Sequence, residues 1–346
     1  VGVTKLEMKE IKKIPVLFGE QDILKTLTLT PGVKSLGEGN GGLYVRGGDN
    51  SQNLILLDEA TVYNASHLLG FFSTFNSDAI KDVTLYKGTA PAEFGGRLSS
   101  VLDVKMNDGN NQKFHVGGGI GLISSRLNVE GPIVKDKGSF LITGRRTYAD
   151  LFLKLSSNEQ LNQNQLYFYD FNAKANYKIN DKNRIFLSGY LGRDVIKISN
   201  RFGIDWGNTT GTLRWNHLWS QKLFSNTSVV YSDYDYRVAI TRDADEFSIT
   251  SSIRNINLKH EFQYYLNSKH TFNFGFNSFY HTITPGQVEA SEGSNINATE
   301  LQNRNALENA IFFSGNWKPN SRWNIEYGVR LSSFNLLGAG DFYSYN

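Results

Sequence analysis

The sequence predicts a small α/β domain followed by the antiparallel strands of a transmembrane β-barrel. Three observations predict this fold class. The residue pattern changes near residue 112, the later part alternates apolar and polar residues with period two, and its connections alternate between short and long. Period two places successive side chains on opposite faces of a strand, so each later segment has one apolar and one polar face.

The composition supports a membrane protein that is built from strands. Aromatic residues make up 13% of the 346 residues, with 17 Tyr and 23 Phe, although only 40% of the residues are apolar. No apolar run approaches the roughly 18 residues that a spanning helix needs. The net charge of +3 is spread along the chain, which argues against a nucleic-acid surface. The absence of cysteine excludes disulfide scaffolds and thiolate metal sites.

Residues 1 to about 108 indicate short strands, turns and small helices. A brief helix is expected over residues 23–27, ended by Thr30, Pro31 and Gly32. Strands are expected at 43–46, 54–57, 79–86 and 101–105, separated by polar and glycine-rich turns.

After residue 112 the alternation becomes long and regular. Between Tyr169 and Tyr177, for example, aromatic and alanine residues alternate with polar ones such as Asp170 and Lys174. About eleven such strands are expected between residues 113 and 335. A soluble antiparallel sandwich is the alternative, but its strands are usually about 5–6 residues long. Alternation over 9 to 12 residues fits a tilted strand that crosses a bilayer.

The connections and the aromatic residues favour the barrel. Tight polar turns are expected at 180–183, 220–222, 267–269 and 318–321. Long loops are expected at 155–165, 194–208 and 284–305, and short turns on one side with long loops on the other are typical of outer-membrane barrels. Aromatic residues near strand ends fit interfacial girdles: Tyr169, Trp219, Tyr264 and Trp323.

A glycine-rich stretch matches the G-x-G-x-x-G pattern of dinucleotide-binding loops, at Gly37, Gly39 and Gly42. Such a loop requires a helix after the glycines to receive the pyrophosphate. Here the glycines are followed by Leu-Tyr-Val-Arg, another glycine pair and Leu-Ile-Leu-Leu-Asp, and none of this has helical periodicity. The glycines are therefore interpreted as turn residues, because a positive φ costs them little.

The first part of the chain resembles the plug domain of TonB-dependent outer-membrane receptors. The matching segments follow the family's order over residues 30 to 104: Thr30–Val33, Tyr44–Gly48, Gln52–Glu59, Val62–Asn64, Ile80–Gly88 and Phe94–Val104. The Gly-Gly-Arg-Leu-Ser-Ser version of the last segment, together with the long loops, is similar to receptors of the Bacteroidetes type.

The resemblance implies a plug over residues 1–110 and, over residues 111–346, about half of a 22-stranded barrel. It implies a TonB-dependent active transporter in the bacterial outer membrane that imports a scarce nutrient: a siderophore, cobalamin, a glycan or a peptide. Implied partners are the TonB–ExbB–ExbD system, outer-membrane lipid, the imported ligand and a surface lipoprotein. The family's TonB box is not recognisable before Leu6, and the chain ends without the family's closing aromatic strand, so we expect a fragment.

The resemblance also implies two sets of site residues. Arg46 and Lys87 occupy positions of plug cations that pair with glutamates on the inner barrel wall, a latch whose acidic partners are expected outside this chain. The alternative is that Arg46 anchors its own turn. Ligand contacts are implied for three plug turns, which are otherwise ordinary solvated turns: Glu38 and Asn40; Asp49, Asn50 and Gln52; Tyr63, Asn64 and His67.

No catalytic, cofactor or metal pattern stands out in the sequence, so we expect neither an enzyme nor a bound cofactor. Asp233, Asp235, Asp243 and Asp245 form an acidic region that lacks the EF-hand spacing, and a solvated loop is expected there. Tyr148, Tyr167, Trp206 and Tyr234 are candidates for ligand stacking, although girdle or loop packing is the more common role. The alternative function is a structural or assembly component of an outer-membrane complex without TonB-driven transport.

Overall fold

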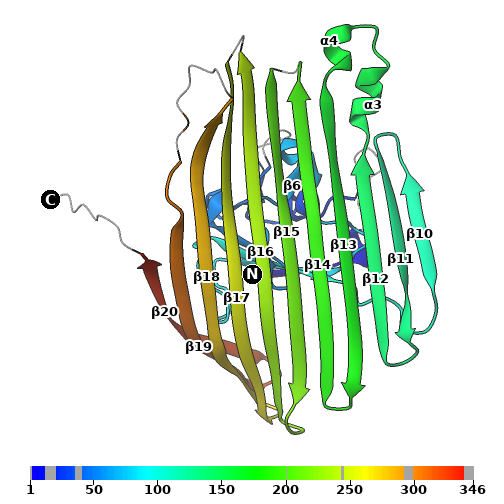
Figure 1. Cartoon of the computed structure of the whole chain (residues 1–346). Coiled ribbons are helices and arrows are strands. Elements are labelled where there is room, and N and C mark those ends of the chain that lie inside the picture. Colours follow the sequence, from blue (N-terminus) through cyan, green and yellow to red (C-terminus); the bar gives the residue numbers. More distant parts are fainter. Residues whose placement is uncertain are drawn as a thin grey trace, which may run out of the picture.

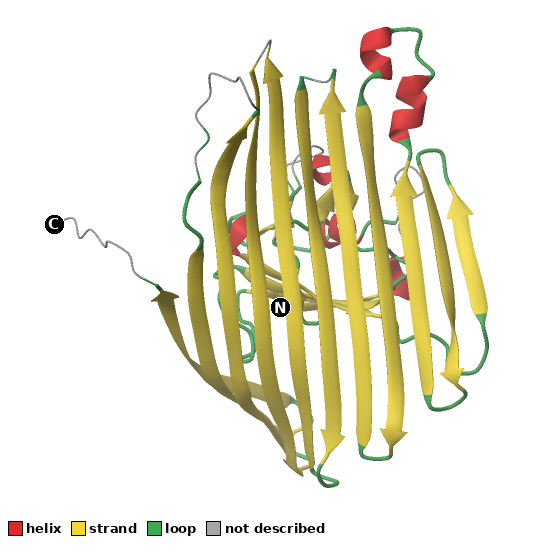
Figure 2. Cartoon of the chain, in the orientation of Figure 1, coloured by secondary structure: helices red, strands yellow, loops and turns green. Residues whose placement is uncertain are grey.

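The computed structural model describes residues 2–11, 21–35, 41–199, 201–242, 245–291, 298 and 300–338. It contains a five-stranded sheet in the N-terminal part and an eleven-stranded antiparallel sheet in the rest of the chain. The large sheet is curved, and the N-terminal part lies against one of its faces (Figure 1). Figure 2 shows how strands dominate both parts. We call the N-terminal part, up to Met106, the plug and the large sheet the wall.

The plug is a small mixed domain. Its main sheet has the order β1-β8-β9-β4-β5, in which β4 and β9 are parallel and the other pairs are antiparallel. The plug strands are β1 (Val3–Glu7), β2 (Val33–Lys34), β3 (Tyr44–Val45), β4 (Asn53–Leu57), β5 (Ala60–Thr61), β6 (Ser66–His67), β7 (Phe72–Ser73), β8 (Ile80–Lys87) and β9 (Ser100–Met106). The core of the plug includes Ile23, Leu27, Val83, Leu85 and Val104, all with no exposed surface.

The predicted helix at 23–27 is present as α2 (Ile23–Thr28). Asp22 caps its first turn, because its carboxylate accepts a hydrogen bond from the Lys25 backbone N–H at 2.9 Å. Gly32 follows with a φ of +80°, a conformation that glycine adopts without strain.

The other helices are short. They are α1 (Met8–Ile11), α3 (Ala149–Lys154), α4 (Glu159–Asn162) and the 3₁₀ turns η1 (Asn50–Gln52) and η2 (Leu68–Gly70). Among the residues that the structure describes, no helix is long and apolar enough to cross a membrane.

The eleven predicted strands of the wall are confirmed. Each pairs antiparallel with the next along the chain, from β10 to β20. Their bounds are β10 (His115–Ile120), β11 (Ser124–Val134), β12 (Gly138–Thr147), β13 (Gln165–Asn180), β14 (Asn183–Ile198), β15 (Phe202–Leu218), β16 (Leu223–Arg242), β17 (Asp245–Asn267), β18 (His270–Ala290), β19 (Arg304–Asn320) and β20 (Trp323–Leu337).

The two faces of the wall differ as the alternation predicts. On β13, Phe171 is 45% exposed on the outer face, whereas Lys174 is 4% exposed on the face that meets the plug. Across the neighbouring strands, large apolar side chains are exposed on the outer face: Leu187, Leu191, Leu213, Val229, Ile256, Leu258, Phe274, Phe276, Ile311 and Phe313. An apolar band of this extent fits contact with lipid.

The two ends of the wall differ in their connections. The turn end carries the tight connections at 135–137, 181–182, 219–222, 268–269 and 321–322, and the opposite loop end carries α3 and α4 (Figure 1). The predicted tight turns are thereby confirmed.

One predicted loop is wrong, and a second is shorter than predicted. Residues 194–208 do not form a long loop, because β14 continues to Ile198 and β15 begins at Phe202. Residues 284–290, predicted as loop, likewise belong to β18. A paired strand that extends beyond the apolar environment can carry polar residues. The polarity of these residues was therefore not sufficient to place the boundary between strand and loop.

The outer face generates a testable prediction. Phe276 lies about half-way up the apolar band of β18 and is 40% exposed. We expect Phe276→Arg to lower the free energy of unfolding by about 2–4 kcal/mol, the cost of a cation at the bilayer midplane. Urea unfolding of the complete protein in phospholipid vesicles measures this. Tyr177→Arg, near the turn end, is the control and should cost about 0–1 kcal/mol. Equal losses at the two depths would contradict a lipid-facing band.

Candidate functional site

The interface between the plug and the wall is the candidate site, because most of the buried charges among the described residues meet there. Asp58 and Glu59 lie at the end of β4, and both have positive φ, 45° and 77°. The turn itself accounts for these angles, because Asp58 and Glu59 form the two-residue connection between β4 and β5, where Leu57 pairs with Ala60, and such tight hairpin turns favour positive φ at both residues. Each of the two carboxylates pairs with a cation of the wall, as described next.

Lys174 on β13 is 4% exposed, and its Nζ lies 3.0 Å from an Asp58 carboxylate oxygen and 3.0 Å from Asp108. The same ammonium donates a hydrogen bond to the Met106 carbonyl at 2.9 Å. Arg214 on β15 pairs with Glu59 at 3.2 Å. Buried charges that are paired and also hydrogen-bonded in this way are costly to separate, because each would be left uncompensated.

A second buried group surrounds His67 at the end of β6. Its Nδ1 lies 2.7 Å from Asp194 of β14, and its Nε2 lies 3.4 Å from Asp170 of β13. Asp194 also accepts a hydrogen bond from the Leu68 backbone N–H at 2.7 Å. The imidazole stacks on Phe168 at a centroid distance of 4.0 Å. Burial lowers the pKa of His67, but Asp194 and Asp170 together outweigh it and hold that pKa above its ordinary value.

Arg145 completes this second group. Its guanidinium pairs with Asp170 at 2.6 Å and donates to the Ser73 carbonyl of the plug at 2.8 Å. The wall strands β12 to β15 therefore hold plug residues 58 to 76 through buried polar contacts. We call these contacts the clamp, defined by Asp58, Glu59, His67, Arg145, Asp170, Lys174, Asp194 and Arg214. The sequence shows these wall residues only as members of the polar set of each strand.

The predicted ligand turn at 63–67 faces the wall. The Tyr63 backbone N–H donates to Asn208 at 3.1 Å, and the Asn208 amide donates to the Asn64 carbonyl at 3.0 Å. Tyr63 also accepts a hydrogen bond from Asn255. His67 is 1% exposed and its ring is enclosed by the carboxylates of the clamp, and its ligand role stays a prediction.

The other predicted ligand turns differ. Glu38 and Asn40 lie outside the described residues. Asp49 is exposed and caps η1 in a capping box with Gln52, and the Asn50 side chain accepts from the Leu43 backbone N–H at 3.1 Å. Hydrogen bonds from Ser51 lower the pKa of Asp49. These side chains shape their own turn, and their ligand role stays a prediction.

The predicted latch residues Arg46 and Lys87 lie close to plug turns. Lys87 is 5% exposed and donates to the Pro31 carbonyl of the plug at 3.0 Å. Arg46 has a φ of 50°, and its guanidinium lies beside Gly88. The latch role of both residues stays a prediction.

The four aromatic residues predicted as candidates for ligand stacking lie in different surroundings. Trp206 is 3% exposed, Tyr148 donates hydrogen bonds to Gly121 and Ser124, and Tyr234 lies 6.2 Å from the Tyr63 ring. Arg146 lies over the Tyr167 ring at 5.3 Å.

The expected acidic loop is wrong for its first two members, which lie in β16. Asp233 pairs with Arg254 at 3.2 Å and Asp235 with Arg193 at 3.0 Å. Asp243 and the Asp245 side chain lie outside the described part. Within the described residues, no group of three or more His, Cys, Asp or Glu side chains could hold a metal ion.

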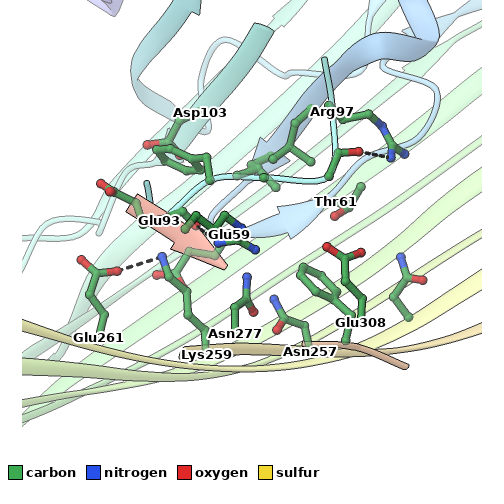
Figure 3. A pocket seen from close by; sticks show the side chains of 18 of the residues that line it. Glu59, Thr61, Glu93, Arg97, Asp103, Asn257, Lys259, Glu261, Asn277 and Glu308 are labelled. Carbon is green, nitrogen blue, oxygen red and sulfur yellow. Dashed lines mark hydrogen bonds and ion pairs between the residues drawn. The ribbon is translucent and has the colours of Figure 1, made fainter. Parts of the chain in front are cut away.

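A cavity of about 250 Å³ separates the plug from strands β15 to β20 (Figure 3). It is lined by charges of both signs: carboxylates of Glu59, Glu93, Asp103, Glu261 and Glu308, and cations of Arg97, Lys105, Arg214, Lys259 and Arg330. Lys259 pairs with Glu261 at 2.9 Å. On this side Arg330 binds the plug through long hydrogen bonds of 3.3 Å to the carbonyls of Ala92 and Glu93.

The fold and the clamp define a class of protein in which a small domain packs against the polar face of a sheet of membrane-type strands. Residues 2–100 match the family model described as TonB-dependent Receptor Plug Domain, so this part of the chain is a plug of that type. The match and the fold together support a TonB-dependent receptor. A search of curated protein sequences gives no match.

Solved structures show the same fold at low sequence identity. The siderophore receptor PirA from Acinetobacter baumannii has a TM-score of 0.73 and 15% identity, over 97% of this chain and 58% of its own. A mutant of the ferric enterobactin receptor PfeA from Pseudomonas aeruginosa has a TM-score of 0.71 and 13% identity, with the same coverage. The copper transporter OprC has a TM-score of 0.73 and 14% identity, over 96% and 56%. The chain thus spans less than two thirds of these proteins.

The clamp generates a prediction about stability. Lys174→Met would leave Asp58 buried without its cation, and we expect the free energy of unfolding to fall by about 3–5 kcal/mol. Urea unfolding of the complete protein, followed by tryptophan fluorescence, measures the change. Adding Asp58→Asn to Lys174→Met should restore part of it, since the uncompensated charge is removed. Lys178→Met is the control, because its partner Asp181 is exposed and such pairs contribute about 0–1 kcal/mol. A loss as small as the control's would contradict the clamp.

His67 generates a prediction about pH. Because its pKa is higher in the folded protein than in the unfolded chain, the protonated ring stabilises the fold fully below about pH 6.5. That contribution is lost as the pH rises through the folded pKa. We expect the free energy of unfolding to decrease over this rise, and to change less in His67→Gln. Denaturant titrations between pH 6 and 9 test this, with His270→Gln at the turn end of β18 as the control. The same pH slope in His67→Gln as in the unchanged protein would refute it.

Proposed function

We propose that the chain is the plug and N-terminal barrel half of an active importer in the bacterial outer membrane, driven by TonB. The observation that carries the proposal is a plug of the TonB-dependent type seated against the polar face of an eleven-stranded membrane-type sheet. A lumen filled by a folded domain is closed to free diffusion, so passage requires work on the plug. We place the boundary between plug and barrel near residue 110.

The proposal orients the molecule and names its partners. The turn end of the wall faces the periplasm and the loop end faces outward, as is usual for outer-membrane barrels. TonB, with ExbB and ExbD, would act on the periplasmic side of the plug. Lipid covers the outer face of the wall, and a surface lipoprotein is a further partner at the loop end. The Gly-Gly-Arg-Leu-Ser-Ser segment supports a receptor of the Bacteroidetes type.

The cargo is proposed only as a scarce nutrient. The solved relatives are described as siderophore, ferric enterobactin and copper proteins, so one fold serves chemically different cargoes. We propose as ligand contacts the residues that the resemblance implies: Glu38, Asn40, Asp49, Asn50, Gln52, Tyr63, Asn64 and His67. Arg46 is proposed as the plug cation of the latch.

A structural or assembly role is the second candidate, and the clamp is the observation that favours it. Buried pairs such as Lys174–Asp58 hold the plug to the wall, as a permanently closed scaffold would require. The two candidates differ in whether the plug has to move.

Uptake by cells with and without TonB separates them. The ligand that copurifies with the complete protein is identified by mass spectrometry, and its radiolabelled form is supplied to both strains. We expect uptake to require TonB. Arg46→Glu should reduce uptake severalfold while membrane insertion stays normal, and Lys81→Glu, an exposed cation of β8, serves as the control. Uptake that does not depend on TonB would reject the importer, and unchanged transport by Arg46→Glu would reject the latch alone.

A further inference from the structure

The two sides of the plug are attached to the wall in different ways. Toward β12 to β14 the clamp joins buried charges at distances of 2.6 to 3.4 Å, whereas its pair of Glu59 with Arg214 of β15 is 21–23% exposed and borders the cavity. Toward β16 to β20 the plug segment 89–97 faces the cavities of about 250 and 850 Å³, and the hydrogen bonds of Arg330 are 3.3 Å long. The cavity of about 250 Å³ therefore belongs to the loosely attached side.

Two buried asparagines of the wall point into this cavity without hydrogen-bond partners for their side-chain oxygens. Asn257 on β17 is 4% exposed and Asn277 on β18 is 8% exposed, and the Oδ1 of each has no partner in the described structure. Figure 3 shows both amides directed from the strands toward the plug. On the opposite side, one carboxylate oxygen of Glu93 is also buried and unpartnered. Buried polar atoms normally have partners, so these three indicate a place for a ligand that donates hydrogen bonds.

The charges of the lining restrict the ligand's own charge. The cavity's five carboxylates are matched by its five cations, so it offers no net charge to an ion. A charged ligand would also compete with resident pairs such as Lys259 with Glu261. A neutral ligand with hydroxyl groups meets neither cost, because a hydroxyl donates to amide or carboxylate oxygens and accepts from ammonium or guanidinium groups.

Aromatic rings complete the lining. Tyr63, Tyr86, Phe94 and Phe279 border the cavity, and the rings of Tyr86 and Phe94 lie 5.5 Å apart. Flat apolar faces beside amide and charged groups suit a ring that has C–H faces and hydroxylated edges. The volume of about 250 Å³ is slightly below that of typical drug-sized sites, which limits the occupant to about one such ring.

We propose that this cavity is a binding site for one neutral polyhydroxylated ring, as in a saccharide, held between the plug and strands β16 to β18. The proposal rests on the importer function and names the class of its cargo. The site lies on a route through the loosely attached side. A cavity of about 460 Å³ toward the loop end shares its Tyr63, Arg97 and Glu308, and one of about 850 Å³ toward the turn end shares its Tyr86, Glu93 and Arg330.

Saccharide binding to the complete protein in detergent micelles tests the proposal. Glucose, galactose, mannose and xylose are the neutral probes, and choline and acetate are the charged ones. Saturation-transfer NMR should show binding of at least one saccharide and of neither ion. Asn257→Leu and Asn277→Leu should each weaken that binding about tenfold, through the loss of one hydrogen bond.

Asn172→Leu is the matched control. Asn172 is a buried inner-wall asparagine of β13, 1% exposed, with an unpartnered amide nitrogen, and it lies on the clamped side. We expect it to bind the saccharide as the unchanged protein does. Heat-modifiable gel mobility checks that each variant is folded. If a variant does not fold, a density map of the unchanged protein with the saccharide decides, since ring-shaped density between Phe279 and Asn257 supports the site and water alone overturns it.

Three results would overturn the proposal: binding of choline or acetate without any saccharide, no binding of any probe, or full saccharide binding by both Asn257→Leu and Asn277→Leu. These results are distinct from a failure of the importer function. TonB-dependent uptake of a cargo without hydroxylated rings would reject the saccharide site and support the importer function. Saccharide binding in the cavity without TonB-dependent uptake would support the site and reject the importer function.

Discussion

The polar inner face of the wall is the constraint on which the rest of the structure depends. Strands that present an apolar face to lipid necessarily turn the alternate residues inward, and here these include Arg145, Asp170 and Lys174, all less than 5% exposed. A buried charge without a partner is far more costly than one that is paired. The plug supplies partners through Asp58, His67 and backbone carbonyls, so its position follows from the need to compensate these charges.

The features that could be predicted from the sequence are those that local periodicity determines, and the features that were missed depend on pairing between distant segments. The eleven strands, the tight turns and α2 follow from local pattern, because the period of two and the cap at Asp22 are properties of short segments. The strand extensions at Ile198 and Phe202 were missed because their polar residues resemble a loop until the partner strand is known. Part of the candidate site depends on contacts between residues that are far apart in the sequence. Glu59 and Arg214 are 155 residues apart, and no local signal joins them.

The turn at 63–67 shows what a family resemblance leaves out, namely the partners that the rest of the chain gives to a segment. The inner-wall amide of Asn208 holds the backbone of Tyr63 and Asn64. His67, for which a ligand contact is predicted, meets Asp194 in this structure. The inner-wall asparagines Asn208, Asn257 and Asn277 could not be recognised as parts of a site in the sequence, because asparagine on the polar side of an alternating strand is equally consistent with a solvated face.

The difference between the clamped and the loosely attached sides bears on how a plug could move without losing its fold. Displacing the segment at 58–76 would expose several buried ion pairs together, and each uncompensated charge is strongly destabilising. Displacing the segment at 89–97 breaks the long hydrogen bonds of Arg330 and the contact of Lys259 with the Phe94 ring, beside a cavity that already contains unpartnered polar atoms. Since a given amount of work displaces the less stable region first, a pull on the plug is expected to open the side of β16 to β20 while the clamp keeps the plug on the wall.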